Sequence, residues 1–352
     1  MPHHELPLLL SRVVTLWRHA FHFHHSVARM IEMVGYYIQT SPRIFRRGSL
    51  TSGSSRKAPN RREVSTGHPK RPLLIHYHIF KNAGTSFEWS LAQSMGIGFR
   101  KLDSPIRGGI VSPRDIARFA ANNPDAKAIS SHQAILFAPK VRGREVFTSI
   151  LIRDPIARIG SIYAFERRQE VSTPGALKAK ELDFKRYVEW RLSATPAMLC
   201  NYQVYFCGRT KEQGSNWVPT ALTLERAIAN LDQVDAVGTV ERYEEWLALA
   251  RSILSKPFPG ISLCSSRRNV SASEQETSNA AILDGLIGGL GQTMAERLLE
   301  GNQLDMCLHQ VADALLTRRL AERGVEIALL EAYASLQKER WPTSVDVSSV
   351  VK

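Results

Sequence analysis

The sequence predicts an α/β protein in which a parallel β-sheet is flanked by helices, with a helical extension before it. Two apolar runs of strand length support this prediction, residues 73–79 (LLIHYHI) and 147–152 (FTSILI). Each run is followed by a short polar segment and then by apolar residues at helical spacing. Strands that alternate with helices in this way form parallel sheets. The 352 residues allow two average domains, or one large α/β domain with extensions.

Composition and charge narrow the protein class. A hydrophobic fraction of 43% excludes a wholly disordered chain and a fibrous repeat. The four cysteines are too few for a disulfide scaffold, and no Cys/His spacing is typical of a zinc site, so a reducing compartment is expected. The net charge of +13 indicates a polyanionic partner, such as nucleic acid, acidic lipid, acidic saccharide or a phosphate-rich cofactor.

Most of the excess charge lies in residues 41–72. This segment has nine basic residues and one acidic residue, so it holds eight of the thirteen excess positive charges. It is rich in Ser, Gly and Pro and has almost no apolar periodicity, which predicts a flexible basic linker. A solvated tether is the favoured interpretation, and an arm that binds nucleic acid or a membrane surface is the alternative. The remaining body is only mildly basic, so the charge does not favour a specific nucleic-acid partner.

Residues 1–40 are expected to form one or two amphipathic helices. The apolar spacing in 6–38 is helical, but Arg12, Arg18, Arg29 and Glu32 interrupt every window of the roughly 18 residues that a membrane span needs. We therefore expect the segment to lie on a membrane surface or on the body of the protein. Six of the eleven histidines lie here; a polar helix face is favoured over a metal cluster because their spacing is irregular.

The first strand leads into a segment that is typical of an anion-binding loop. Residues 80–86 (FKNAGTS), here called the first anion loop, are followed by Phe87, Leu91 and Met95 at helical spacing. Backbone N–H groups at a helix N-terminus bind anions, and the helix dipole favours negative charge there. Lys81 precedes the glycine and the first glycine of GxxxxGK[ST] is missing, so the loop is poorly suited to metal-assisted triphosphate chemistry.

The second strand ends in a similar arrangement. Arg153, Asp154 and Pro155 directly follow it, and we call these three residues the second anion loop. Pro155 suits the first position of the helix that comes next, and Ser161 lies two turns into that helix. Ligands of open parallel sheets bind outside the carboxyl ends of the strands. Arg153 and Ser161 are therefore candidates for binding a second phosphate.

HIFKNAGTS and RDPIARIGSIY together resemble motifs of the carbohydrate sulfotransferases in the heparan/uronyl 2-O-sulfotransferase-like family. In that family the two motifs have the forms H-x-P-K-[TN]-[AG]-G-T-S and R-D-P-x-x-R-x-x-S-x-Y. The segments 201–203 (NYQ), 237–242 (VGTVER), 267–270 (RRNV) and the pair Asn302 and Asp305 are also similar to the family. The resemblance covers about residues 73–320. Phe80 departs from the pattern, since the family has proline there.

The resemblance implies a P-loop, nucleotide-kinase-like sulfotransferase fold over residues 73–340, with a C-terminal tail at 341–352. It implies 3′-phosphoadenosine 5′-phosphosulfate (PAPS) as the donor and no required metal. The residues expected to bind the 5′-phosphosulfate are Lys81, Asn82, Ala83, Gly84, Thr85 and Ser86. Arg153 and Ser161 would bind the 3′-phosphate, and Arg267 or Arg268 could close over the nucleotide, with a solvated loop pair as the alternative. Arg158, Arg167 and Arg168 are expected on a solvated helix face.

Sulfuryl transfer requires a charge partner for the leaving phosphate and a base for the acceptor hydroxyl. Lys81 is the expected charge partner. His132 is the expected base, because it follows a short apolar strand at 128–131 and so lies at a carboxyl end. The family often has a histidine base in a similar position. Asp154 is the alternative base, although capping of the helix at Pro155 is its favoured role.

The acceptor is expected to be a carbohydrate or glycolipid hydroxyl. Basic residues in loop 138–145, near the proposed base, and in loop 171–181 could contact an acidic saccharide, with solvated loop charge as the alternative. Eukaryotic members of the family work in the Golgi behind a membrane anchor. With no uncharged spanning segment and few cysteines, a cytoplasmic enzyme with peripheral attachment to the inner membrane face is expected here. A kinase of a small metabolite, or a non-catalytic anion- or membrane-binding protein, is the alternative function.

Overall fold

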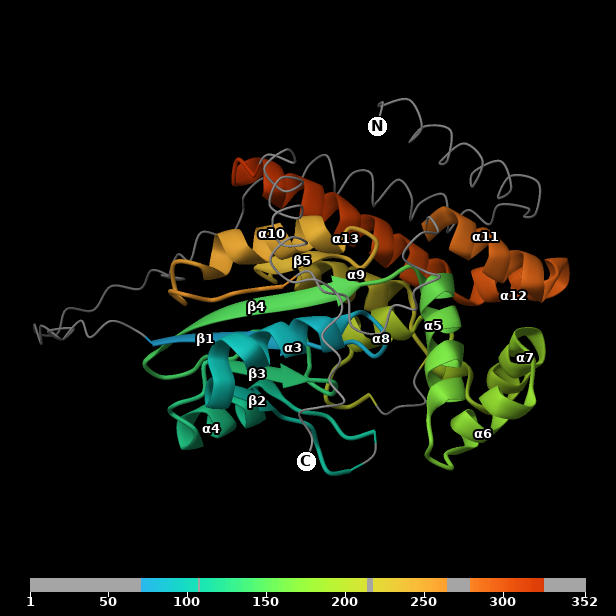
Figure 1. Cartoon of the computed structure of the whole chain (residues 1–352), viewed down its shortest axis with the longest axis horizontal. Coiled ribbons are helices and arrows are strands. Elements are labelled where there is room, and N and C mark those ends of the chain that lie inside the picture. The colour runs from blue at the N-terminus through green and yellow to red at the C-terminus, as the bar shows by residue number, and fades with distance from the viewer. Residues whose placement is uncertain (1–70, 107, 214–217, 265–278, 326–352) are drawn as a thin grey trace, which may run out of the picture. The chain divides into compact units, whose positions relative to one another are not determined.

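The core of the protein is a five-stranded parallel sheet with the strand order β2-β3-β1-β4-β5 (Figure 1). The computed structural model describes residues 71–325, except 107, 214–217 and 265–278. The strands are β1 (Arg71–Tyr77), β2 (Phe99–Lys101), β3 (Ala128–Ser131), β4 (Arg144–Ile152) and β5 (Ala236–Thr239). The expected segments 1–40 and 341–352, most of the linker, and Arg267 and Arg268 lie outside the described residues. The expectation of a parallel sheet flanked by helices is confirmed.

β1 is the central strand because its side chains are apolar on both faces. Leu73, Leu74 and Ile75 are fully buried, as the sandwiched strands of a parallel sheet require. β1 pairs with β3 on one side and with β4 on the other. Consequently the segments that follow β3, β1 and β4 leave the same edge of the sheet side by side. The predicted loop that contains His132 and both anion loops begin at this edge.

β4 starts earlier than the sequence indicated, at Arg144 rather than at Phe147. Arg144 pairs with Arg71 in the sheet and its guanidinium donates to the backbone oxygens of Arg71, Pro72 and Ala126. The expectation that this residue lies near the base is therefore wrong. The reason is topological: a parallel connection has to return to the amino edge before its next strand can begin.

Helices α3 (Gly84–Met95), α10 (Tyr243–Leu254) and α13 (Gln303–Glu322) pack against the sheet. Phe87, Leu91, Trp246 and Leu316 share one buried cluster with Leu74. α4 (Pro113–Asn122), α8 (Tyr202–Gly208) and α9 (Ala221–Asp232) complete the helical layers of the sheet domain (Figure 1). Short 3₁₀ turns lie at Gly96–Gly98 and Pro196–Met198. Among the described residues, no helix has the length and apolar character needed to cross a bilayer.

A second group of helices packs beside the sheet domain (Figure 1). It contains α5 (Pro155–Arg168), α6 (Pro174–Glu181), α7 (Phe184–Ala194), α11 (Asn279–Leu290) and α12 (Gln292–Gly301). Of the late helices α11, α12 and α13, only α13 packs against the sheet, because Leu290 of α11 and Leu298 of α12 pack against α5 and α7 instead. Apolar periodicity shows that a helix face is buried but not which element buries it.

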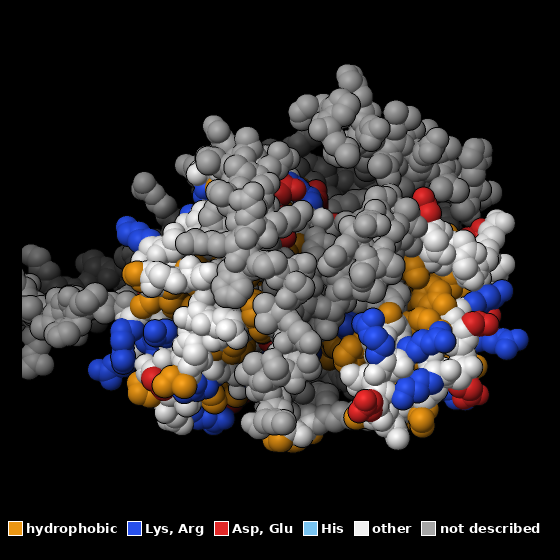
Figure 2. Space-filling model, viewed as in Figure 1, with side chains coloured by type: hydrophobic (Ala, Val, Ile, Leu, Met, Phe, Trp, Pro, Cys, Tyr) orange, Lys and Arg blue, Asp and Glu red, His pale blue; other side chains and the backbone are white. Residues whose placement is uncertain are grey.

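The expected loop 171–181 is largely the helix α6, which begins after an N-cap threonine with proline at its first position. Figure 2 shows that Lys and Arg side chains over α5, α6 and α7 are interspersed with Asp and Glu. Lys178, for example, pairs with Glu181 at 2.7 Å. The mixture of charges gives no continuous basic surface there, so Lys178 and Lys180 gain no support as acceptor contacts.

Candidate active site

The first anion loop turns sharply between β1 and α3. Lys81 and Ala83 both have left-handed backbone conformations, with φ of 67° and 57°. Such conformations are strained for residues other than glycine and are typical of functional loops. They let Asn82 N–H bond back to the oxygen of Ile79 and start α3 at Gly84. The first-turn amides of α3 point out of the helix end, which is the arrangement expected of an anion site.

Lys81 lies against an aromatic ring of α5. Its Nζ is 4.3 Å from the centre of the Phe165 ring, and Phe80 meets the same ring edge-on. A cation over an aromatic face is attracted by the ring quadrupole. The contact therefore holds the Lys81 ammonium group against α5.

The Asn82 side chain joins the first anion loop to neighbouring elements. Its side chain is buried, and Nδ2 donates to the backbone oxygen of Leu151 at 2.9 Å and to Oε1 of Gln203 at 2.6 Å. The side-chain amide thus ties the loop to β4 and α8 rather than pointing to the outside. Thr85 is exposed, whereas the Ser86 side chain is buried. Binding of an anion by Asn82 and Ser86 stays a prediction.

The second anion loop lies directly beside the first. Arg153 Nη1 donates to the backbone oxygen of Lys81 at 3.1 Å, which joins the two loops. Asp154 accepts hydrogen bonds from the N–H groups of Ile156 and Ala157, so it caps α5 as favoured. Burial raises the pKa of the Asp154 carboxyl, and both cap bonds end on its Oδ1. Ser161 is half-buried on α5.

The expectation of a solvated Arg158 is wrong, because its side chain is completely buried. Its Nε donates to the oxygen of Phe80 at 3.2 Å, Nη1 donates to the oxygen of Met198 at 3.1 Å, and the guanidinium stacks over Tyr202. Burial lowers its pKa. Arg158 thus holds Phe80, the first residue of the first anion loop, from inside the protein. Arg167 and Arg168 are exposed, as expected.

His132 follows β3 at the same edge, as expected, and has a partner that the sequence did not indicate. Its Nδ1 lies 3.1 Å from Oδ2 of Asp103, whose Oδ1 accepts from the His132 N–H at 2.7 Å and from the Ser131 hydroxyl at 3.1 Å. Burial opposes ionisation of Asp103, but the bonds from His132 and Ser131 outweigh it and lower the pKa of Asp103. An ionised Asp103 accepts a hydrogen bond from Nδ1–H of His132, and this tautomer has its lone pair on Nε2.

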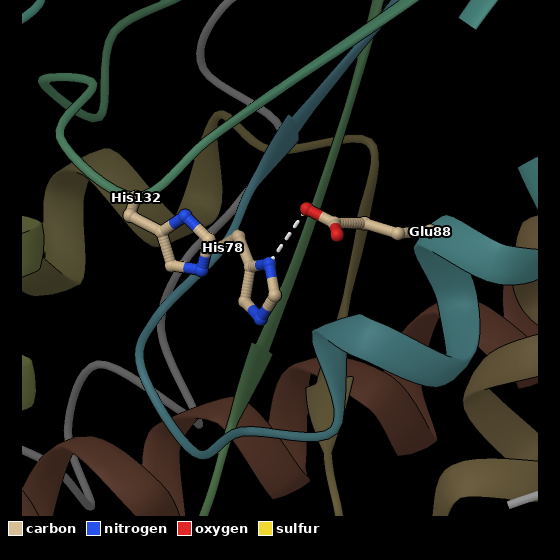
Figure 3. Close-up of side chains that lie close together, drawn as sticks. All are labelled: His78, Glu88 and His132. Atoms are coloured by element: carbon tan, nitrogen blue, oxygen red, sulfur yellow. Dashed lines mark hydrogen bonds and ion pairs between the residues drawn. The ribbon is translucent and has the colours of Figure 1, made fainter. Parts of the chain in front are cut away.

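His78 packs against His132 (Figure 3). Its ring stacks on the His132 ring with centroids 4.0 Å apart, and its Nδ1 bonds to Oε1 of Glu88 at 2.8 Å. Glu88 also accepts from Ser130 and pairs with Lys101 at 2.6 Å. Burial opposes ionisation of Glu88, but these bonds hold its pKa far below the ordinary value. Burial lowers the pKa of His78. A neutral His78 thus has its Nδ1–H fixed by an ionised carboxylate.

Ligand atoms of His78, Glu88 and His132 lie within 4.8 Å of one another, so a metal site has to be considered. Both Glu88 oxygens already have partners, and one partner is the Lys101 ammonium. The His78 and His132 rings are stacked on each other. The cluster therefore fits a hydrogen-bonded support for His132 better than a metal centre.

Asp103, His78 and Glu88 were not recognised as site residues from the sequence. Asp103 comes two residues after β2, a strand of three residues that has no clear strand pattern. An acidic residue after an edge strand was the available signal. Glu88 lies one turn into α3, where a buried carboxylate is unexpected.

Comparison with known proteins identifies relatives of this chain. No protein-family profile matches the chain. An uncharacterized protein of Archaeoglobus fulgidus is 31% identical over 245 residues, which cover 68% of this chain and 94% of that protein. The chain therefore belongs to one family with this archaeal protein. Heparan sulfate 2-O-sulfotransferase 1 of Gallus gallus is 27% identical over 57% of this chain, and that of Homo sapiens is 25% identical over the same share.

This chain is a distant homologue of the heparan sulfate 2-O-sulfotransferases. The match spans 60% of the length of those enzymes. The homology supports membership of a sulfotransferase family, as the sequence motifs indicated.

Proposed function

We propose that the protein is a sulfotransferase that moves the sulfuryl group of PAPS to a hydroxyl of a carbohydrate or glycolipid. The observation that carries this proposal is the position of the His132–Asp103 pair at the sheet edge from which both anion loops leave. A base, a cationic loop and an anion-binding helix end are thus brought to one edge. PAPS supplies a sulfuryl group on a phosphate leaving group and fits a site with two neighbouring anion loops.

His132 acts as the base in this proposal. Nε2 of His132 takes the proton of the acceptor hydroxyl while the oxygen of that hydroxyl forms the new bond to sulfur. Asp103 holds Nδ1 and stabilises the imidazolium that results. Lys81 balances the charge that develops on the phosphate oxygen when its bond to sulfur breaks. Arg153 lies close enough to the Lys81 backbone to orient the same loop and to bind a 3′-phosphate.

The decisive experiment is transfer from radiolabelled PAPS to a panel of saccharide and glycolipid acceptors. His132→Ala should lower kcat by about 10²–10⁴-fold, the usual contribution of a general base, and leave donor affinity unchanged. Lys81→Ala should lower kcat and weaken donor binding together. His68→Ala, a substitution ahead of the domain in the sequence, is the matched control. A His132→Ala enzyme with near wild-type kcat would eliminate this mechanism.

Calorimetry distinguishes the alternative functions. A sulfotransferase should bind adenosine 3′,5′-bisphosphate without magnesium, and a metabolite kinase should prefer ATP with Mg²⁺. Binding of neither nucleotide, together with binding to anionic vesicles that is lost on deleting residues 1–72, would favour a non-catalytic membrane-binding protein.

The proposal includes a cytoplasmic location with peripheral attachment to the membrane through residues 1–72. Removing residues 1–40 should shift the protein from the membrane fraction to the supernatant and preserve nucleotide binding. Equal partition of truncated and full-length protein would argue against attachment by this segment.

A further inference from the structure

The side-chain amide of Gln203 contacts both anion loops at once. Its Oε1 accepts from Nδ2 of Asn82 at 2.6 Å and from the backbone N–H of Arg153 at 2.9 Å. Its Nε2 donates to the backbone oxygen of Arg153 at 2.7 Å. The amide group therefore bonds to both the backbone N–H and the backbone oxygen of Arg153, as a neighbouring β-strand would. Its bond to the Asn82 side chain connects it to the first anion loop as well. Gln203 is completely buried, so water does not compete for these bonds.

Gln203 is itself fixed by a buried carboxylate from α13. Asp305 accepts from the N–H groups of Gln203 at 3.1 Å and Val204 at 2.8 Å. Asn201 adopts a left-handed conformation, and its Oδ1 accepts from the N–H groups of Leu304 and Asp305. Asn201 N–H in turn donates to Oδ1 of Asn302 at 3.2 Å. The segments at 201–203 and 302–305 are thereby joined into one rigid support behind the loops.

Only glutamine satisfies this arrangement. Two bonds need an acceptor and two need a donor, because Nε2 also donates to Oδ2 of Asp305 at 3.4 Å, and a carboxamide supplies both at the end of one side chain. Asparagine is one methylene shorter, and an ionised glutamate would place a charge against the oxygen of Arg153 and the carboxylate of Asp305.

We propose that Gln203 is a positioning residue that fixes the two anion loops relative to each other, so that the two phosphate groups of one nucleotide bind as a unit. This inference rests on the proposed function, because it assumes a ligand with an anion in each loop. The physical reason is preorganisation: loops already held at the right separation need no ordering when the second phosphate binds. A misplacement of about 1 Å between two subsites can cost about 10²-fold in a process that uses both.

The test compares three probes on wild type and Gln203→Met, which keeps the side-chain volume but removes the amide. The probes are adenosine 3′,5′-bisphosphate, adenosine 5′-monophosphate and adenosine 3′-monophosphate, measured by calorimetry. We expect Gln203→Met to weaken bisphosphate binding by about 10- to 100-fold and each monophosphate by about threefold or less. Gln292→Met, at an exposed glutamine of α12 that bonds to Glu296, is the matched control and should change none of the three.

Asn82→Ala provides a second variant if Gln203→Met fails to fold, because it leaves the bonds between Gln203 and Arg153 intact and removes the bond from Gln203 to the first loop, together with the bond from Asn82 to Leu151. It should show the same selective loss for the bisphosphate, measured on protein whose thermal unfolding remains cooperative. An equal loss for all three probes would overturn the inference and leave Gln203 as a support of the fold. If wild type binds the bisphosphate no better than the monophosphates, the proposed nucleotide function fails, and the coupling fails with it.

Discussion

Replacing Gly84 with alanine should displace His78, the residue that packs against the proposed base. A Cβ atom at this first position of α3 would lie 2.2 Å from Cδ2 and 2.4 Å from Nε2 of the His78 ring. Both distances are well below van der Waals contact. The ring cannot simply rotate away, because Glu88 holds its Nδ1 and His132 stacks on its face.

The expected cost follows from these contacts. Overpacking in a dense interior costs about 1–3 kcal/mol, and the usual gain from replacing a helical glycine, roughly 0.5–1 kcal/mol, offsets part of it. We expect a net loss of about 1–2 kcal/mol, which lowers Tm by about 2–8 °C in a domain of this size. Nucleotide affinity should also fall, because relief of this clash would shift the first turn of α3, whose backbone amides are proposed to bind the anion.

Thermal unfolding and calorimetry with adenosine 3′,5′-bisphosphate measure the two effects. Gly285→Ala is the matched control: this glycine is an exposed residue of α11, and a Cβ atom there would meet nothing within 4 Å. That variant should be as stable as wild type or slightly more stable. A Gly84→Ala protein with wild-type Tm and affinity would refute the close packing of His78 beneath the loop.

Three further predictions concern single side chains. Asp103→Asn should lower kcat about 10²-fold or more at unchanged donor affinity, because the variant has no carboxylate to fix the tautomer of His132. Asp125→Asn, a substitution at an exposed aspartate, is the control and should not change kcat. Arg158→Met should lower the free energy of unfolding by roughly 2–5 kcal/mol in denaturant titrations, since two buried carbonyls lose their donor, and wild-type stability would contradict this. Burial lowers the pKa of His76 to about 3, so between about pH 6.5 and 3 the unfolded chain binds a proton that the folded chain does not. Stability should therefore fall as pH falls through this window, and a His76→Gln protein that loses as much stability between pH 7 and 5 as wild type would refute the assignment.

Features that depend on neighbouring residues in the chain were predicted well. The strands before both anion loops, the start of α3 at the loop and the cap of α5 by Asp154 follow from short patterns of apolar, glycine, proline and capping residues. The position of His132 after a short strand was also predicted correctly. Local backbone preferences decide such features, so a single sequence contains the information.

Burial of polar side chains was predicted less well. Arg158 was expected in solvent because it lies in a helix with charged neighbours, yet it is completely buried. Its burial depends on the oxygens of Phe80 and Met198, which come from two other parts of the chain. A buried arginine requires such acceptors, and nothing near it in the sequence supplies them.

The sequence by itself determined the class of the protein: a parallel α/β fold, two anion loops and a histidine at a strand end, all set by local patterns. The tertiary structure decided which of these elements meet. Asp103 reaches His132 because β2 lies next to β3, and Gln203 reaches Asn82 and Arg153 because Asp305 of α13 holds the start of α8 beside the loops that follow β1 and β4. Strand order and helix packing depend on the burial of the whole core, so contacts between residues that are distant in the sequence follow only from the complete fold.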